Sequence, residues 1–392
     1  MANKNITLHQ KNNSGIYDNL YINTVATKLS NSASLDSELE MTDGNSDSSM
    51  NKIASDLKLL GIIHIRVVYE DSSPIQGIVI SGLQEDKTTD ENGDVYGKIG
   101  NTNIITLTSP YADIKDKTVD LTNLYKTPFS ILIIQMEHVA NLDILRYEIS
   151  KSVKFSKHVE AVDVCCVGGG GAGSSAVYDK PNRSWYGGAG GGGGGVVNSF
   201  NVSVAENTDY PLVVGAGGTC LRDDFGYANG GDGGETSFMG VVAKGGNGGT
   251  RTEGSNIMPT STTGGTAGAA GCGDGGIGAR QDDAYSTWPL TESNNGTSNN
   301  SVSEFADGLK FYSGGGGGGK YISKTTGGSG GSPNGARGGY TEYTSSVVHA
   351  PTKPNVGGGG GGACKDNVGN KGGDGGNGLV AIRIHLKGKA TT

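Results

Sequence analysis

Short runs of apolar and β-branched residues, separated by turn sequences, predict β-strands in the first half of the chain. Ile62–Tyr69, Ile75–Ile80 and Ile104–Thr108 have the length and the composition of strands. Pro74 and the cluster Thr88–Gly93 separate them as turns. The pattern predicts a small antiparallel β-domain at residues 61–126.

Residues 1–60 differ from this pattern because they are polar and carry few apolar positions. A segment of that composition cannot bury a core on its own, so we expect it to need partners. Residues 127–392 form the third predicted part of the chain.

The third part is dominated by glycine. Only 8 of the 71 glycines precede Val167, and four runs follow it, at Gly168–Gly171, Gly190–Gly195, Gly314–Gly319 and Gly357–Gly362. So much glycine is typical of a flexible linker. Here, however, strand-like segments frame the runs, among them Val162–Val167 before the first and Leu379–Leu386 near the end of the chain.

An ordered alternative exists for these runs. Polyglycine can form an extended helix with three residues per turn and a rise of about 3.1 Å per residue, like that of polyproline II. Such helices pack side by side because no Cβ separates their backbones, although glycine loses the most entropy on folding. We expect ordered glycine helices or tight glycine-lined strands, with flexible spacers as the alternative. The predicted fold class is mainly β with polyglycine II-type helices.

The net charge of the chain and the length of its apolar runs limit the classes of partner that it can bind. The net charge of −8 argues against nucleic acid and anionic membranes as main partners. The N-terminus lacks the apolar core of a signal peptide, and apolar runs such as Ile131–Ile134 are too short to span a bilayer. We expect synthesis in a cytoplasm and release by lysis or as part of a particle.

No pattern of reactive residues indicates catalysis. The five cysteines have no metal-binding spacing, and the six histidines are scattered. Paired carboxylates such as Asp223-Asp224 are interpreted as solvated turns, although a glycosidase also uses two carboxylates. Asp232, Asp274 and Asp374 follow glycines, but without the nine-residue period of calcium-binding repeats. We expect no enzyme activity, no cofactor and no metal.

Aromatic residues in the segments between the glycine runs are the candidate binding residues. Short polar side chains surround them, and that combination is typical of adaptable binding loops. Such rings also stack on sugars, although some could cap the glycine layer as core. The candidate receptor-binding residues are Trp185, Tyr186, Phe225, Tyr227, Tyr285, Trp288, Tyr312 and Tyr321.

The order of motifs in residues 61–126 resembles that of transthyretin-like β-sandwiches. The resemblance rests on Pro74-Ile75-Gln76-Gly77 and Thr89-Asp90-Glu91-Asn92-Gly93, each between predicted strands. It implies a non-catalytic spacer, and an unrelated sandwich remains the alternative because these signals recur in many all-β folds.

The order of motifs from about residue 155 to 386 resembles the glycine-rich domain of phage tail-fibre tips and related adhesins. A strand enters a glycine run, and Val214-Gly215-Ala216-Gly217-Gly218, Thr236-Ser237-Phe238 and Gly378-Leu379-Val380-Ala381-Ile382-Arg383 follow in that order. Near the N-terminus, Gly15-Ile16-Tyr17-Asp18 is similar to the start of tail proteins of phages that infect Gram-positive bacteria.

These resemblances imply a receptor-binding protein of a phage or phage-tail-like particle. Residues 1–60 would attach the chain to tail or baseplate proteins of the virion, and residues 127–392 would bind a bacterial surface glycan or surface-layer protein. The resemblance implies a homotrimer. The alternatives are a structural baseplate scaffold that binds no receptor and a depolymerase that degrades surface polysaccharide.

Overall fold

The computed structural model shows an all-β chain, with no helix in the part that it describes. Near the N-terminus, β1 (Thr7–Lys11) pairs with β2 (Tyr17–Tyr21). The described residues are 7–11, 17–21, 62–122, 131–179, 184–220, 229–251, 262–267, 272–276, 280–282, 295–297, 304–306, 309–311, 314–317, 335, 340–342, 345–347, 357–361 and 371–388.

The first unit consists of two sheets that share one hydrophobic core. One sheet has the order β6-β3-β9, and the other β5-β4-β7-β8. In β7 the residues alternate between exposed and buried, so Ile105 and Leu107 enter the core while Ile104 faces solvent. The strands are β3 (Ile62–Val68), β4 (Val79–Ser81), β5 (Lys87–Thr88), β6 (Asp94–Lys98), β7 (Ile104–Thr108), β8 (Lys117–Asp120) and β9 (Leu132–Gln135).

Strand β9 extends this unit beyond residue 126, where the sequence predicts its end. It pairs in parallel with β3, and Ile134 and Met136 lie in the same core cluster as Ile65 and Leu107. The predicted divisions at residues 60 and 126 otherwise fall in segments outside the described residues.

The second unit begins with two further sheets that pack face to face. Their orders are β10-β24-β12-β15 and β11-β16-β17-β18, and Val164, Phe238 and Ile382 lie in the core between them. The strands are β10 (Ile144–Tyr147), β11 (Lys151–Val153), β12 (Val159–Val167), β15 (Val196–Ser203), β16 (Tyr210–Val213), β17 (Thr236–Phe238), β18 (Val241–Ala243) and β24 (Leu379–Leu386).

The two central strands, β12 and β24, are covered on both faces. One face lies in the core between the sheets, and Phe305 and Phe311 pack against Cys165, Val167 and Leu379 on the other. Covering both faces explains why these strands are almost continuously apolar in sequence instead of alternating.

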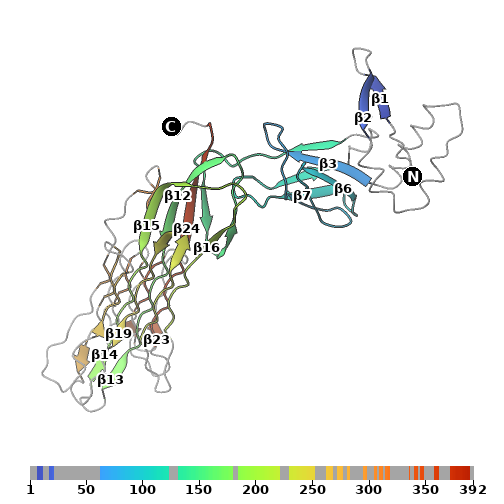
Figure 1. Cartoon of the computed structure of the whole chain (residues 1–392). Coiled ribbons are helices and arrows are strands. Elements are labelled where there is room, and N and C mark those ends of the chain that lie inside the picture. The colour runs from blue at the N-terminus through green and yellow to red at the C-terminus, as the bar shows by residue number, and fades with distance from the viewer. Residues whose placement is uncertain are drawn as a thin grey trace, which may run out of the picture.

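Glycine-rich segments extend from the ends of these strands and run side by side (Figure 1). Each segment runs either away from the sheets or back toward them, and we call these segments passages. The described outward passages are 168–176, 214–220, 244–249, 272–276, 314–317 and 357–361, and the return passages include 187–195, 229–235, 264–267 and 371–378.

The backbone hydrogen bonds of the first passage repeat every three residues. The amides of Gly168 and Gly171 donate to Gly195 and Gly192, so the donor advances by three residues while the acceptor recedes by three. The amides between them donate to two other passages, Gly169 to Gly234 and Gly170 to Gly376. Its carbonyls accept from three more passages, through the amides of Gly218, Gly246 and Gly360. The first passage is therefore surrounded by six others.

Glycine is sterically required in these inner passages. A Cβ added to Gly170 would lie 2.1 Å from the carbonyl oxygen of Gly358, and one added to Gly191 would lie 2.1 Å from that of Gly171. Only backbone occupies those positions, so no side chain can move aside. The pure glycine runs therefore lie inside, where every described residue of 168–176 and 187–195 is buried.

Outer passages show a three-residue period of exposure instead. In the passage 371–378 the exposed or half-buried positions include Lys371, Asp374 and Asn377, and the glycines between them are mostly buried. The same spacing is found along 229–235, where Asn229, Asp232 and Glu235 are exposed. It is found again along 244–250, where Lys244, Asn247 and Thr250 are exposed.

Candidate functional site

The described strands that join outward and return passages lie at the end of the bundle opposite β12 and β24. There β13 (Val177–Asp179), β14 (Ser184–Tyr186) and β21 (Arg280–Asp282) form a three-stranded sheet. The sequence folds this way because 168–176 leads outward into β13 and 187–195 leads back from β14. Figure 1 shows β13, β14, β19 and β23 together at this end, which we call the far end.

Two further strand pairs are β19 (Thr250–Arg251) with β20 (Thr262–Thr263), and β22 (Tyr340–Glu342) with β23 (Ser345–Val347). Strand β19 directly continues the outward passage 244–249, and 264–267 follows β20 as its return. Connections separated by many residues in the sequence are thus brought to one end of the bundle.

Two of the eight candidate residues lie in described strands. Trp185 and Tyr186 belong to β14, where Trp185 is the backbone partner of Tyr178 on one side and of Gln281 on the other. Tyr186 is the partner of Val177 and Arg280. The register thus places Tyr178, Gln281 and Arg280 beside the two candidates, although no sequence pattern connects β21 with β14.

The other six candidates lie outside the described residues: Phe225, Tyr227, Tyr285, Trp288, Tyr312 and Tyr321. In chain order, Phe225 and Tyr227 fall between the outward passage 214–220 and its return. Next to Tyr312, Phe311 is only 6% exposed and packs on the outer face of β12 and β24, so this neighbouring ring is core.

Asp374 and Asn377 hold two outer passages together, and the sequence reasoning missed their role. Asn377 Oδ1 accepts the amide of Gly217 at 2.8 Å, and Asp374 Oδ1 accepts that of Cys220 at 3.2 Å. Asp232 likewise accepts the amide of Gly248 at 2.8 Å. The detectable signal is the repeated triplet of two glycines followed by Asp, Asn or Thr, whose three-residue period is the period of exposure along the outer passages.

A family model described as a glycine-rich domain matches residues 148–385. This chain belongs to that family. The match begins just before β11 and ends within β24, so it covers all the passages and every strand of the two packed sheets except β10 and the last residue of β24. No curated protein shows significant similarity to the chain.

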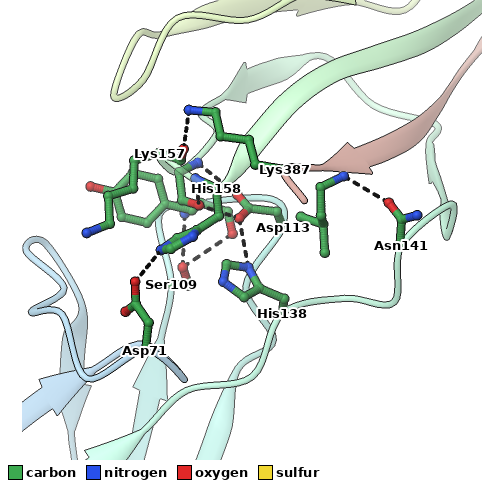
Figure 2. Close-up of polar contacts among 11 residues, drawn as sticks. Asp71, Ser109, Asp113, His138, Asn141, Lys157, His158 and Lys387 are labelled. Carbon is green, nitrogen blue, oxygen red and sulfur yellow. Dashed lines mark hydrogen bonds and ion pairs between the residues drawn. The ribbon is translucent and has the colours of Figure 1, made fainter. Parts of the chain in front are cut away.

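The glycine-rich domain meets the first unit through a buried carboxylate. Asp113 is fully buried, and its two carboxylate oxygens accept the amide of Ser156 at 2.9 Å and the hydroxyl of Ser156 at 2.6 Å. His138 Nδ1 lies 3.2 Å from Asp113 Oδ2. Beside them, the amide of Ala112 donates to the carbonyl of Lys154 at 2.9 Å. We call this set of contacts the joint; Figure 2 shows the His138 ring directed toward Asp113.

Another buried carboxylate lies within the glycine-rich domain. Asp163 is 1% exposed, and Arg383 donates to its Oδ2 from Nε at 2.8 Å, with Arg383 Nη2 2.6 Å away. Asp163 Oδ1 accepts the amide of Asn201 at 2.8 Å, where the pairing of β12 with β15 shifts register. Burial by itself raises the pKa of Asp163, but the Asn201 amide, His385 and Arg383 outweigh it, so the pKa is lowered. The carboxylate therefore fixes a bulge.

Among the residues that the structure describes, no group of three or more His, Cys, Asp or Glu side chains is arranged to hold a metal ion. The same part of the chain contains no helix long and apolar enough to cross a membrane. The described cysteines are all buried, and Cys165 and Cys166 are free thiols.

Proposed function

We propose that the passages are polyglycine II-type helices. The three-residue repeat of hydrogen-bond partners along 168–174 supports this, because a helix with three residues per turn directs successive amides to three different neighbours. The three-residue exposure period at Lys371, Asp374 and Asn377 supports it independently, because every third residue faces the same side. Two pure-glycine runs, 168–171 and 190–195, then form the interior of a rigid bundle.

We also propose that the first unit is a transthyretin-like β-sandwich that acts as a spacer. Its two sheets share the core that contains Ile65, Ile80 and Leu107, as the sheets of a sandwich do. Residues 1–60 attach the chain to tail or baseplate proteins.

The function that this architecture supports best is receptor binding. The chain is a tail-fibre or tail-tip adhesin of a phage or phage-tail-like particle, and it attaches the particle to a bacterial surface glycan or surface-layer protein. One observation carries the proposal: the out-and-back path of the passages places strands with aromatic and polar residues, such as Trp185 and Tyr186, at the far end of the bundle. Binding residues are commonly displayed in this way, on loops held by a rigid scaffold.

The bundle suits this task because it is stiff without bulky side chains. Backbone hydrogen bonds link each inner passage to its neighbours, so displacement of one loop must disturb several passages. A homotrimer would present three such ends, and several weak contacts would add up through multivalency. Light scattering of the full-length chain tests the trimer, and a mass near the single-chain value of 39.9 kDa would contradict it.

The test of receptor binding uses labelled full-length protein and a panel of Gram-positive bacterial cells. Trp185→Ala, Tyr285→Ala and Trp288→Ala should each melt like the parent, and at least one should weaken adhesion by about 2 kcal/mol or more as a hot spot. The matched control is Phe200→Ala, because Phe200 is an exposed aromatic residue on β15 at the opposite end of the bundle. If all three variants bind as tightly as the parent, the aromatic-loop proposal fails.

The two other functions predict different outcomes. A baseplate scaffold would bind no cells in the panel although it is folded, and would instead associate with other tail proteins. A depolymerase would release reducing sugar ends from purified surface polysaccharide, which the proposed adhesin would not.

A further inference from the structure

The joint between the first unit and the glycine-rich domain contains two histidine rings in contact. His138 follows β9 in the first unit, and His158 precedes β12 in the second. Their ring centroids are 4.9 Å apart, in an edge-to-face arrangement. Tyr69 contacts both rings, stacked on His138 at 5.5 Å and edge-on to His158 at 4.5 Å. A histidine from each unit therefore packs at the interface.

The two rings have unequal polar partners. His138 Nδ1 lies 3.2 Å from the buried carboxylate of Asp113. The Nε2 of His158 is buried and has no hydrogen-bond partner, since the nearest carboxylate oxygen, on Asp71, is 3.8 Å away. Figure 2 shows the His158 ring directed toward Asp71 and the His138 ring toward Asp113. A charge on His138 meets a buried carboxylate at hydrogen-bond distance, whereas a charge on His158 faces only the exposed carboxylate of Asp71, at 3.8 Å.

We propose that the joint is a pH-sensitive hinge that opens in mild acid, when both His138 and His158 carry a proton. Two imidazolium rings in contact repel each other, and the second charge has no buried acceptor. Opening separates Asp113 from Ser156 and frees the glycine-rich domain to change its orientation relative to the first unit. This inference does not depend on the proposed receptor binding.

The charged groups around the two rings favour opening of the joint in acid. Burial lowers the pKa of His158, and the neighbouring His138 and Lys157 lower it further, against the opposing effect of Asp71. The hydrogen bond with Asp113 raises the pKa of His138, although burial opposes it. The other titratable or charged groups that face these rings from the packed segments are Tyr69, Glu70, Asp71, Asp113 and Lys157.

The direction of the pH dependence follows from how each histidine's pKa in the closed joint differs from its ordinary value. His158 is held neutral in the closed joint, so its contribution is present above the ordinary histidine pKa of 6.5 and is lost as the pH falls through its lowered value. His138 is held protonated, so its contribution is present below 6.5 and is lost as the pH rises through its raised value. The closed joint is therefore most stable between the lowered pKa of His158 and the raised pKa of His138. Below that range it opens because His158 takes a proton.

The test is hydrogen exchange of full-length protein between pH 5 and pH 8, corrected for intrinsic exchange rates and read by mass spectrometry. The amides of Ala112 and Ser156 donate across the joint, so their peptides report its opening. Each unit of pKa difference between the closed and open states of His158 corresponds to about a tenfold increase in the opening constant in acid. The amide of Val67, which donates to Gly93 inside the first unit, should not change.

Two variants and one control complete the test. His158→Phe keeps an aromatic ring against Tyr69 but cannot take a proton, so the acid-induced increase should disappear, and His158→Gln should behave in the same way. The control is His64→Gln, because His64 pairs with Asp94 at 2.9 Å within the first unit; the acid response should remain. Equal protection of Ala112 and Ser156 across the pH range in the parent, or an undiminished response in both His158 variants, would overturn the proposal.

Discussion

The backbone amide of Gly217 donates to the side-chain Oδ1 of Asn377 at 2.8 Å, across 160 residues of sequence. Three residues away on each passage, the amide of Cys220 donates to Oδ1 of Asp374. Two outer passages are thus held together by short side chains spaced three residues apart. The side chains take the place that a backbone carbonyl holds in the interior of the bundle.

Removal of these acceptors should loosen the edge of the bundle. Asn377→Ala leaves the Gly217 amide without its partner, and we expect a loss of about 1 kcal/mol in the free energy of unfolding because the site is partly open to water. Asp374→Ala should cost a similar amount, and Asp374→Asn should restore most of it. Urea unfolding measures both changes.

The control for that pair is Lys371→Ala, at the third position of the same exposed row. Lys371 forms a surface ion pair with Asp374, at 3.3 Å. Such pairs contribute about 0–1 kcal/mol. A loss from Lys371→Ala as large as that from Asn377→Ala would show that the amide acceptors have no special role.

Two adjacent glycines should respond differently to alanine. A Cβ on Gly375 would lie 2.0 Å from the carbonyl oxygen of Gly170, so Gly375→Ala should destabilise the chain by about 1–3 kcal/mol or more. A Cβ on Gly376 would meet its nearest atom, the amide nitrogen of Gly358, at 3.3 Å. Gly376→Ala should therefore be nearly neutral, because alanine also restricts the unfolded chain by about 0.4–1 kcal/mol. Equal melting temperatures for the two variants would argue against the packing described.

The ion pair of Asp163 with Arg383 should make stability depend on acid pH. Because the pKa of Asp163 is lowered from 3.8 in the folded chain, its contribution is present above 3.8 and is lost as the pH falls through the lowered value. Asp163→Asn removes the charge from a buried pair, and we expect a loss of about 3–5 kcal/mol at pH 7.

Urea unfolding from pH 3 to pH 7 measures this dependence in the parent and the variant. The control is Asp209→Asn, since Asp209 forms an exposed pair with Lys154 at 3.2 Å and should contribute little. The prediction fails if Asp163→Asn retains the acid-dependent loss of the parent below pH 4.

The buried thiols should be inert in the folded chain. Burial raises the pKa of Cys166 to about 12 and that of Cys165 well above its ordinary value. Because the thiolate is the reactive form, a thiol reagent at pH 8 should not modify either residue until the chain unfolds. The measurement uses a Cys364→Ser background, because Cys364 lies outside the described residues. Modification of Cys165 or Cys166 under native conditions would contradict the buried core.

The sequence predicted the β class because local pattern is enough for it. The strand-like frames at Val162–Val167 and Leu379–Leu386 appear in the structure as β12 and β24. The concentration of glycine after Val167 marked the domain that the family match covers. Parallel pairing of β9 with β3 was not predictable, because that contact depends on a partner 67 residues away in the chain, and a short apolar run does not specify it.

What the sequence determined by itself is therefore where glycine must occur and where strands frame it, since both follow from local composition. The tertiary structure alone decided which passages lie inside and which outside. Glycines are chemically identical, so Gly170 could have any glycine as its neighbour until the strands fix where each passage begins. The same sheets decide that Gly217 meets Asn377, and the approach of two units decides that His138 meets His158. Such pairings depend on the positions of whole elements, which no local pattern encodes.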